Sequence, residues 1–286
     1  MRHTLMLMMS AAMLTTAFTG TGIPAQASTQ ATYYLSLGDS AAAGFQPPGR
    51  YGHCYADQLY ERALLTMPEL QLLKLGCPGE TTEALISGTG SECDYQAGSQ
   101  LNAATSFLQA HPGRIAFITI NVGVNDVLNA CLNDVTGLIN VVCVKQTMPG
   151  VQANLATILE ALREAALGVP IAGMSYWDPF LGFWTFNQVG HFVARIDNQA
   201  METMNAGLVA TYQDEGALVA DVAGPEYFNI GAFSPRVDTR WGRVPVNVAN
   251  ACRWTWFCSR LFQGDPHPNT TGYGVIADAF QAVLPV

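Results

Sequence analysis

Charged side chains are scarce in this sequence of 286 residues, and positive charges are the scarcest. Its 13 lysines and arginines are scattered along the chain and are outnumbered by 22 acidic residues, which gives a formal net charge of −9. Contacts to phosphate groups need clustered lysine and arginine, so we do not expect a nucleic-acid partner. The acidic balance also predicts a slight repulsion from anionic membrane surfaces.

Apolar runs long enough to span a membrane are missing after residue 27. The first 27 residues have the three parts of a secretory signal peptide: a short start with Arg2, an apolar core over residues 5–18, and a small-residue end at Ala25 to Ala27. An uncleaved membrane anchor is the alternative, but the core is shorter than the roughly 20 residues that cross a bilayer. We therefore expect cleavage after Ala27 and a secreted protein without a stable membrane anchor.

Internal repeats, low-complexity linkers and a second-domain boundary are absent from residues 28–286. About 260 residues suffice for one large domain. Strand-like apolar runs alternate with helix-like segments, which predicts an α/β fold: a flavodoxin-like, three-layer αβα sandwich around a five-stranded parallel sheet. The expected strands are residues 33–37, 70–75, 114–122, 171–176 and 217–222. The expected helices are residues 55–66, 100–110, 151–167, 192–213 and 270–284, whereas residues 224–264 show little periodicity.

The first expected strand stops at Gly38, Asp39 and Ser40. Ligands of open α/β sheets bind at the carboxyl ends of the strands, next to free backbone N–H groups. Ser40 is therefore a candidate nucleophile. A serine after a strand can also be a helix N-cap or a turn residue, and local chemistry alone does not separate these interpretations.

Three later segments favour the interpretation of Ser40 as a nucleophile. They are residues 77–82 (CPGETT), residues 123–126 (GVND) and residues 267–269 (HPN). Together with residues 38–40 (GDS) they resemble, in order and spacing, the four blocks of the SGNH hydrolases, also called GDSL lipases and esterases. Ala41 stands where the family name has leucine. The resemblance covers most of the mature chain and is to secreted, actinobacterial-type members.

The resemblance implies a role for each block. Ester hydrolysis needs a nucleophile, a base and donors aimed at the oxygen that becomes negative. Ser40 would be the nucleophile and His267 the base. The oxyanion hole would consist of the backbone N–H groups of Ser40 and Gly79 and the side-chain amide of Asn125. Gly79 as a turn glycine and Asn125 as a loop cap are the alternatives.

The last block departs from the family pattern. The family usually has its aspartate three residues before the histidine, where this sequence has Gly264, and here the acid is Asp265, two residues before His267. Asp265 can still reach the far ring nitrogen, because the following proline favours an extended or turn conformation. The alternative is a Ser–His dyad whose ring is oriented by the Gly264 carbonyl. We favour Asp265 as the third catalytic residue.

Seven cysteines lie after residue 27 and would meet an oxidising compartment. The sequence cannot fix their connectivity. A metal site is the alternative, but there is no Cys-x-x-Cys and only one histidine lies near a cysteine. We favour three local disulfides, in a pattern similar to that of secreted actinobacterial members of the family: Cys54 with Cys77, Cys131 with Cys143, and Cys252 with Cys258, leaving Cys93 unpaired.

The expected function is a secreted serine hydrolase that cleaves carboxylic esters of small molecules or lipids through an acyl-enzyme, without a cofactor. The same machinery could serve a phospholipase, a carbohydrate O-deacetylase or an acyltransferase, and a non-catalytic binding module is the alternative from another class. An α/β-hydrolase is disfavoured because Ala42 replaces the final glycine of Gly-x-Ser-x-Gly. The aromatic segments 176–184 and 254–257 are candidate walls for an acyl chain, or a satellite core.

Overall fold

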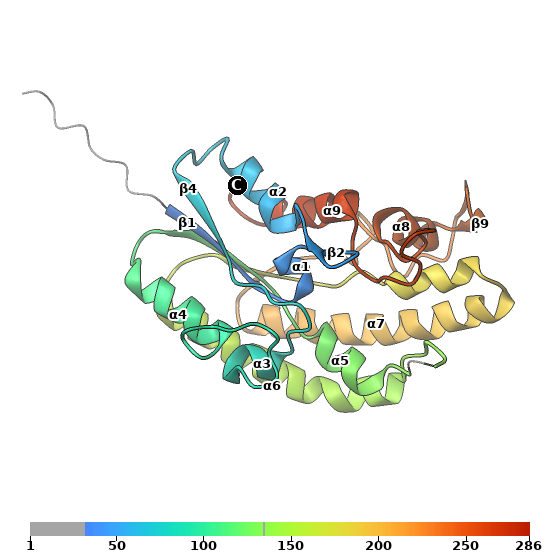
Figure 1. The fold of residues 1–286 in the computed structure, drawn as a ribbon, viewed down its shortest axis with the longest axis horizontal. Helices are drawn as coiled ribbons and strands as arrows, with labels where there is room; N and C mark the ends of the chain where they lie inside the picture. Colours follow the sequence, from blue (N-terminus) through green and yellow to red (C-terminus); the bar gives the residue numbers. More distant parts are fainter. Residues whose placement is uncertain (1–31, 134) are drawn as a thin grey trace, which may run out of the picture.

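The computed structural model describes residues 32–286 except residue 134, so the predicted signal peptide lies outside the described residues. A parallel sheet of five strands forms its centre (Figure 1). The sheet has the strand order of flavodoxin-like folds, which confirms the predicted fold class. The strands in spatial order are β4 (Leu70–Lys74), β1 (Thr32–Gly38), β5 (Ile115–Asn121), β6 (Ile171–Met174) and β7 (Leu218–Ala220).

Helices cover both faces of the sheet (Figure 1). On one face, α2 (Tyr55–Ala63) packs against α9 (Thr270–Gln281). On the other, α6 (Val141–Ala165) packs against α7 (Gln188–Asp214) and α4 (Gln100–Ala110). Because the inner strands are covered on both sides, β1 and β5 read as nearly continuous apolar runs instead of alternating ones.

Shorter elements surround the carboxyl edge of the sheet. Helix α6 begins ten residues before the predicted helix, because the Asn140 side chain accepts hydrogen bonds from the N–H groups of Val142 and Cys143 and the helix continues through Pro149. The remaining elements are α1 (Ser40–Ala43), the hairpin β2 (Phe45–Gln46) and β3 (Arg50–Tyr51), α3 (Thr82–Ser87), α5 (Val124–Cys131), the 3₁₀ helix η1 (Pro179–Thr185), the hairpin β8 (Arg236–Thr239) and β9 (Gly242–Pro245), and α8 (Val246–Trp254).

Two of the three predicted disulfides are confirmed, Cys131–Cys143 and Cys252–Cys258. The third prediction, Cys54 with Cys77, is wrong. Cys77 bonds to Cys93, and Cys54 is the free cysteine in the described part of the chain.

The local surroundings of Cys54 explain the correction. Cys54 is the N-cap residue of α2, and its buried thiol lies 3.1 Å from a carboxylate oxygen of Asp57 and 3.6 Å from the Ala42 carbonyl oxygen. Burial first, and then the negative Asp57, raise the pKa of this thiol to about 12, so it stays protonated.

Within the described residues, no helix combines the length and the apolar character needed to cross a bilayer.

Candidate active site

Ser40 is the first residue of α1, immediately beyond the carboxyl end of β1. Asp39 caps this short helix by accepting a hydrogen bond from the Ala41 N–H at 2.9 Å. Gly44 ends it in the left-handed region with a φ of 84°. The sharp strand-to-helix turn therefore places Ser40 at the carboxyl edge of the sheet. This is the position that the sequence predicted for the candidate nucleophile.

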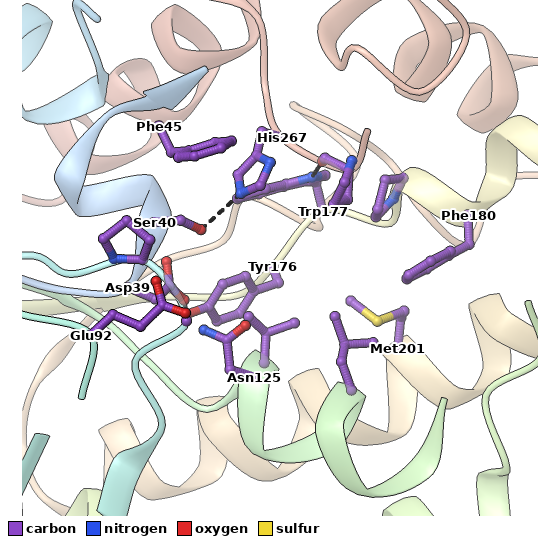
Figure 2. Close-up of a pocket in the computed structure, with 16 residues that line it drawn as sticks. Asp39, Ser40, Phe45, Glu92, Asn125, Tyr176, Trp177, Phe180, Met201 and His267 are labelled. Carbon is purple, nitrogen blue, oxygen red and sulfur yellow. Dashed lines mark hydrogen bonds between the residues drawn. The ribbon is translucent and has the colours of Figure 1, made fainter. Parts of the chain in front are cut away.

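His267 lies beside Ser40 although the two are far apart in the sequence (Figure 2). The His267 Nε2 atom is 3.0 Å from the Ser40 Oγ atom. The Asp265 Oδ1 atom lies 2.9 Å from His267 Nδ1 and also accepts a hydrogen bond from the His267 backbone N–H at 2.9 Å. Of the two acceptors considered for this ring nitrogen, the carboxylate of Asp265 is therefore the one in contact. The loop is held by the Trp177 Nε1–H group, which donates to the Pro266 carbonyl at 2.9 Å.

Gly79 and Asn125 line the same cavity as Ser40. Asn125 sits in the first turn of α5, which begins directly after β5. Its side-chain amide donates one hydrogen bond to the Glu80 carbonyl at 2.9 Å, which ties α5 to the loop that carries Gly79. An asparagine amide has two N–H groups, so one stays available to the cavity. Gly79 has a φ of 73°, a conformation that favours glycine.

Asp126 strengthens the tie between these two segments. Its carboxylate accepts hydrogen bonds from the Thr82 backbone N–H at 2.9 Å and from the Thr82 hydroxyl at 2.6 Å. Asn154 of α6 donates to the same hydroxyl at 3.1 Å. The side chains of Asn125 and Asp126 thus fix the loop after β4 to the helix after β5.

Asp39, the residue before Ser40, is a buried carboxylate. The Tyr176 hydroxyl donates to its Oδ2 atom at 2.6 Å, and the Asn121 amide donates to its Oδ1 atom at 2.6 Å. Burial raises the pKa of Asp39 to about 6, although the hydrogen bonds from Tyr176 and Ala41 oppose the shift. Three elements therefore converge on Asp39 beneath the Ser40 turn.

Gln100 and Asn121 support the site and were missed in the sequence, as was the hydrogen bond from Tyr176 to Asp39. Gln100 accepts a hydrogen bond from the Gly38 N–H at 2.6 Å and donates to the Gly38 carbonyl at 3.0 Å. Gly38 itself has a φ of 131°, and a β-carbon there would lie 2.0 Å from the Asn121 carbonyl oxygen. The sequence motifs did not indicate these residues, because they support the site only through contacts between segments that are distant in the sequence.

The cavity at Ser40 has a volume of about 250 Å³. Figure 2 shows Phe180 and Met201 on the side away from Ser40, with Tyr176 and Trp177 between the two ends. The aromatic segment 176–184 is therefore a cavity wall, as one of the two interpretations predicted. Segment 254–257 does not line this cavity; its buried Phe257 packs against Phe180, with 6.1 Å between the ring centroids, and lines a separate hollow. Among the described residues, no three His, Cys, Asp or Glu side chains gather as a metal site requires.

Comparison with known proteins agrees with the fold and with the sequence blocks. The sequence model of the GDSL-like lipase/acylhydrolase family matches residues 36–275. This chain therefore belongs to that family, whose members hydrolyse esters. No match was found among curated proteins.

Solved structures of lipases share the fold at low sequence identity. The extracellular lipase of Streptomyces rimosus is 13% identical with a TM-score of 0.55, and the match covers 88% of this chain and 100% of that one. The lipase Lip_vut3 from a goat rumen metagenome is 12% identical with a TM-score of 0.54, covering 88% of this chain and 96% of that one. At such identities the likeness establishes the fold alone.

Proposed function

We propose that this chain is a secreted carboxylic ester hydrolase that works through an acyl-enzyme on Ser40. The observation that carries the proposal is the line of contacts from the Ser40 hydroxyl through both ring nitrogens of His267 to the Asp265 carboxylate, at 3.0 Å and 2.9 Å, on the wall of a largely apolar cavity. This is the arrangement in which a base activates a serine and a carboxylate orients the base.

In the first half-reaction, His267 Nε2 accepts the proton of the Ser40 hydroxyl as the Ser40 oxygen bonds to the ester carbonyl carbon. The carbonyl oxygen becomes negative in the tetrahedral intermediate. The N–H groups of Ser40 and Gly79 and the free N–H of the Asn125 amide are the proposed donors to this oxygen. The bond to the alcohol then breaks, and His267 returns the proton to the departing alkoxide oxygen.

In the second half-reaction, water replaces the alcohol. His267 Nε2 takes a proton from the water as its oxygen attacks the acyl carbon, and the same proton later returns to the Ser40 oxygen as the acid leaves. Asp265 keeps the Nδ1–H tautomer in place and stabilises the imidazolium that forms in both half-reactions. Because Asp265 contacts both the ring and the backbone of His267, the orientation of the ring is fixed before substrate binds.

The cavity favours an acyl chain over a sugar. Away from Ser40 its walls are apolar, formed by Val124, Leu128, Phe180 and Met201. A carbohydrate O-deacetylase would need hydrogen-bonding groups there to replace the water lost by sugar hydroxyls. The three disulfides support the proposal of a secreted protein, since such bonds persist in oxidising compartments.

The test is hydrolysis of p-nitrophenyl esters from acetate to palmitate by the wild type, by Ser40→Ala and by Ser106→Ala. Ser106 is an exposed serine of α4 and serves as the matched control. We expect Ser40→Ala to lose at least about a thousandfold in kcat and Ser106→Ala to match the wild type. Equal activity of Ser40→Ala and wild type would refute the nucleophile. An inert wild type would favour a binding module.

A further inference from the structure

A second hollow shares one lining residue, Phe180, with the cavity at Ser40. Its volume is about 530 Å³. We call it the phenylalanine groove, after the four rings that line it: Phe180, Phe183, Phe186 and Phe257. Leu132, Gly137, Gln263 and Gly264 complete its lining, and none of these described lining residues is charged.

The groove is a packed structure and not a chance gap between loops. Phe183 contacts Phe180, Phe186 and Phe257 at ring-centroid distances of 6.3, 5.7 and 5.0 Å. A β-carbon at Gly182 would lie 2.3 Å from the Phe257 ring, so this glycine lets η1 pack closely on that ring. Such edge-to-face and stacked rings hold one another in place.

Two disulfide-closed loops contribute further residues to the groove. Phe257 lies within the loop closed by Cys252–Cys258, and Leu132 lies within the loop closed by Cys131–Cys143. Gly137 in the second loop approaches Phe183 so closely that a β-carbon would lie 2.7 Å from the ring. The groove is thus anchored covalently on two sides of η1.

The groove leaves apolar surface open to water. Phe186 is 45% exposed, in contrast to the buried Phe180 and Phe257. Exposed aromatic surface gains free energy when an apolar group covers it. The uncharged lining and the shared Phe180 wall point to an occupant that is apolar and that extends from the cavity.

The volumes suggest which occupant this is. The cavity at Ser40, at about 250 Å³, is smaller than the roughly 300 to 1,000 Å³ of typical ligand pockets. A long acyl chain whose carbonyl carbon lies at Ser40 would fill it and then reach Phe180. Beyond Phe180, the phenylalanine groove is the adjoining apolar space.

We propose that the phenylalanine groove is the outer acyl subsite, which takes the distal methylenes of long-chain esters after the chain passes Phe180. This inference rests on the proposed function and narrows its substrate class to long-chain carboxylic esters. Each methylene that leaves water fully should raise kcat/KM roughly fourfold. Short-chain esters end within the cavity and gain nothing from the groove.

The test compares Phe186→Ser with Phe192→Ser. Phe192 is 60% exposed on α7, does not line the groove and is the matched control. Substrates are p-nitrophenyl butyrate, p-nitrophenyl palmitate and hexadecyl acetate, which carries its long chain on the alcohol side. We expect Phe186→Ser to lower kcat/KM for the palmitate roughly fivefold or more, with the butyrate unchanged within about twofold. The control should match the wild type on all three.

The outcomes separate the two proposals. Butyrate hydrolysis reports folding and the chemistry at Ser40, so a wild type inactive on every ester refutes the proposed function. If the wild type is active and Phe186→Ser keeps the wild-type ratio of palmitate to butyrate activity, the groove inference is wrong and the proposed function stands. A loss confined to hexadecyl acetate would also overturn it, because the groove would then bind the alcohol side.

Discussion

The three loops closed by disulfides differ in the kind of contact that holds them. The loop closed by Cys77–Cys93 carries Gly79 and is tied down by polar contacts, such as the Ser91 hydroxyl that donates to the Glu80 carboxylate at 2.7 Å. The loops closed by Cys131–Cys143 and Cys252–Cys258 hold apolar side chains around η1.

This contrast suggests a division between chemistry and selectivity. The first loop, called the donor loop here, lies where charge would develop during the reaction, and its hydrogen bonds fix the direction of N–H groups. The other two, the apolar loops, shape the surface that an acyl chain would contact. Changes in the donor loop should therefore alter kcat at every acyl length, and changes in the apolar loops should alter the dependence on length.

The largest effect after loss of the nucleophile is expected for Asn125→Ala. Removing one oxyanion donor costs about 100 to 1,000-fold in kcat, and Asn125 also ties the donor loop to α5. Because the donor acts on the carbonyl oxygen, the loss should be the same for butyrate and palmitate esters. Steady-state kinetics of Asn125→Ala beside Asn102→Ala, an exposed asparagine of α4, provides the check. A loss that grows with chain length would place Asn125 in the acyl subsite instead.

A smaller loss is expected for Asp265→Asn. The asparagine oxygen can still accept hydrogen bonds from both the backbone and the ring of His267, so the tautomer is kept while the negative charge is lost. We expect kcat to fall about 10 to 100-fold, because a charge-assisted hydrogen bond becomes a neutral one. Asp265→Ala should lose more, since it removes the acceptor as well. Equal kcat for wild type and Asp265→Ala would mean that the ring needs no carboxylate.

The disulfides offer the most direct comparison of the two kinds of loop. Replacing either Cys77 and Cys93 or Cys252 and Cys258 by alanine should lower the free energy of unfolding by about 2 to 3 kcal/mol. The first pair should lower kcat severalfold at all acyl lengths. The second should lower kcat/KM for palmitate more than for butyrate. Urea unfolding and ester kinetics of both variants test this. If kcat/KM depended on acyl length in the same way in both variants, the proposed division between chemistry and selectivity would be wrong.

The smallest effect concerns a buried acidic pair behind η1. Burial, and then the nearby Asp197, raise the pKa of Asp178 to about 8, and burial raises the pKa of Asp197 to about 7. Asp178 caps η1 by accepting from the Phe180 N–H, and Asp197 accepts from the Ile139 N–H. The Asp197 Oδ2 atom is buried with no hydrogen-bond partner among the described residues.

The direction of the pH effect follows from these shifts. A carboxyl group whose pKa is raised by folding adds stability below its ordinary value of 3.8, and this contribution is lost as the pH rises through about 7 and 8. Asp197→Asn removes one charge of the pair and can keep the bond to Ile139. Its Tm should exceed that of the wild type by about 2 to 4 °C at pH 8 and by less at pH 5. The same difference in Tm at pH 5 and pH 8 would contradict the raised pKa values of Asp178 and Asp197.

The regular part of the molecule was predictable because its signals are local. β1 and β5 are apolar runs that end in the blocks carrying Ser40 and Asn125, and the sheet brings those ends together. The adjacency of His267 to Ser40 followed from the resemblance to the family. The roles assigned to these residues stay predictions until the variants are measured.

The irregular part was not predictable, because long-range contacts decide it. Residues 224–264 lack periodicity, yet they fold into the β8–β9 hairpin and α8. Cys77 lay within reach of either Cys54 or Cys93 along the chain, and the three-dimensional structure pairs it with Cys93 while the Cys54 thiol contacts Ala42 of α1 and Asp57. The aromatic wall at Tyr176 was found from composition, but its bond to Asp39 was not.

The most direct test of the account is covalent labelling by a p-nitrophenyl alkylphosphonate, followed by intact mass and peptide mapping. The Ser40 oxygen should attack phosphorus, p-nitrophenolate should leave, and one adduct should map to the peptide that contains Ser40. His267→Ala should slow the labelling, Ser40→Ala should abolish it, and Ser106→Ala should not affect it. An adduct on another residue, or labelling of Ser40→Ala at the wild-type rate, would contradict the assignment of Ser40 as the nucleophile.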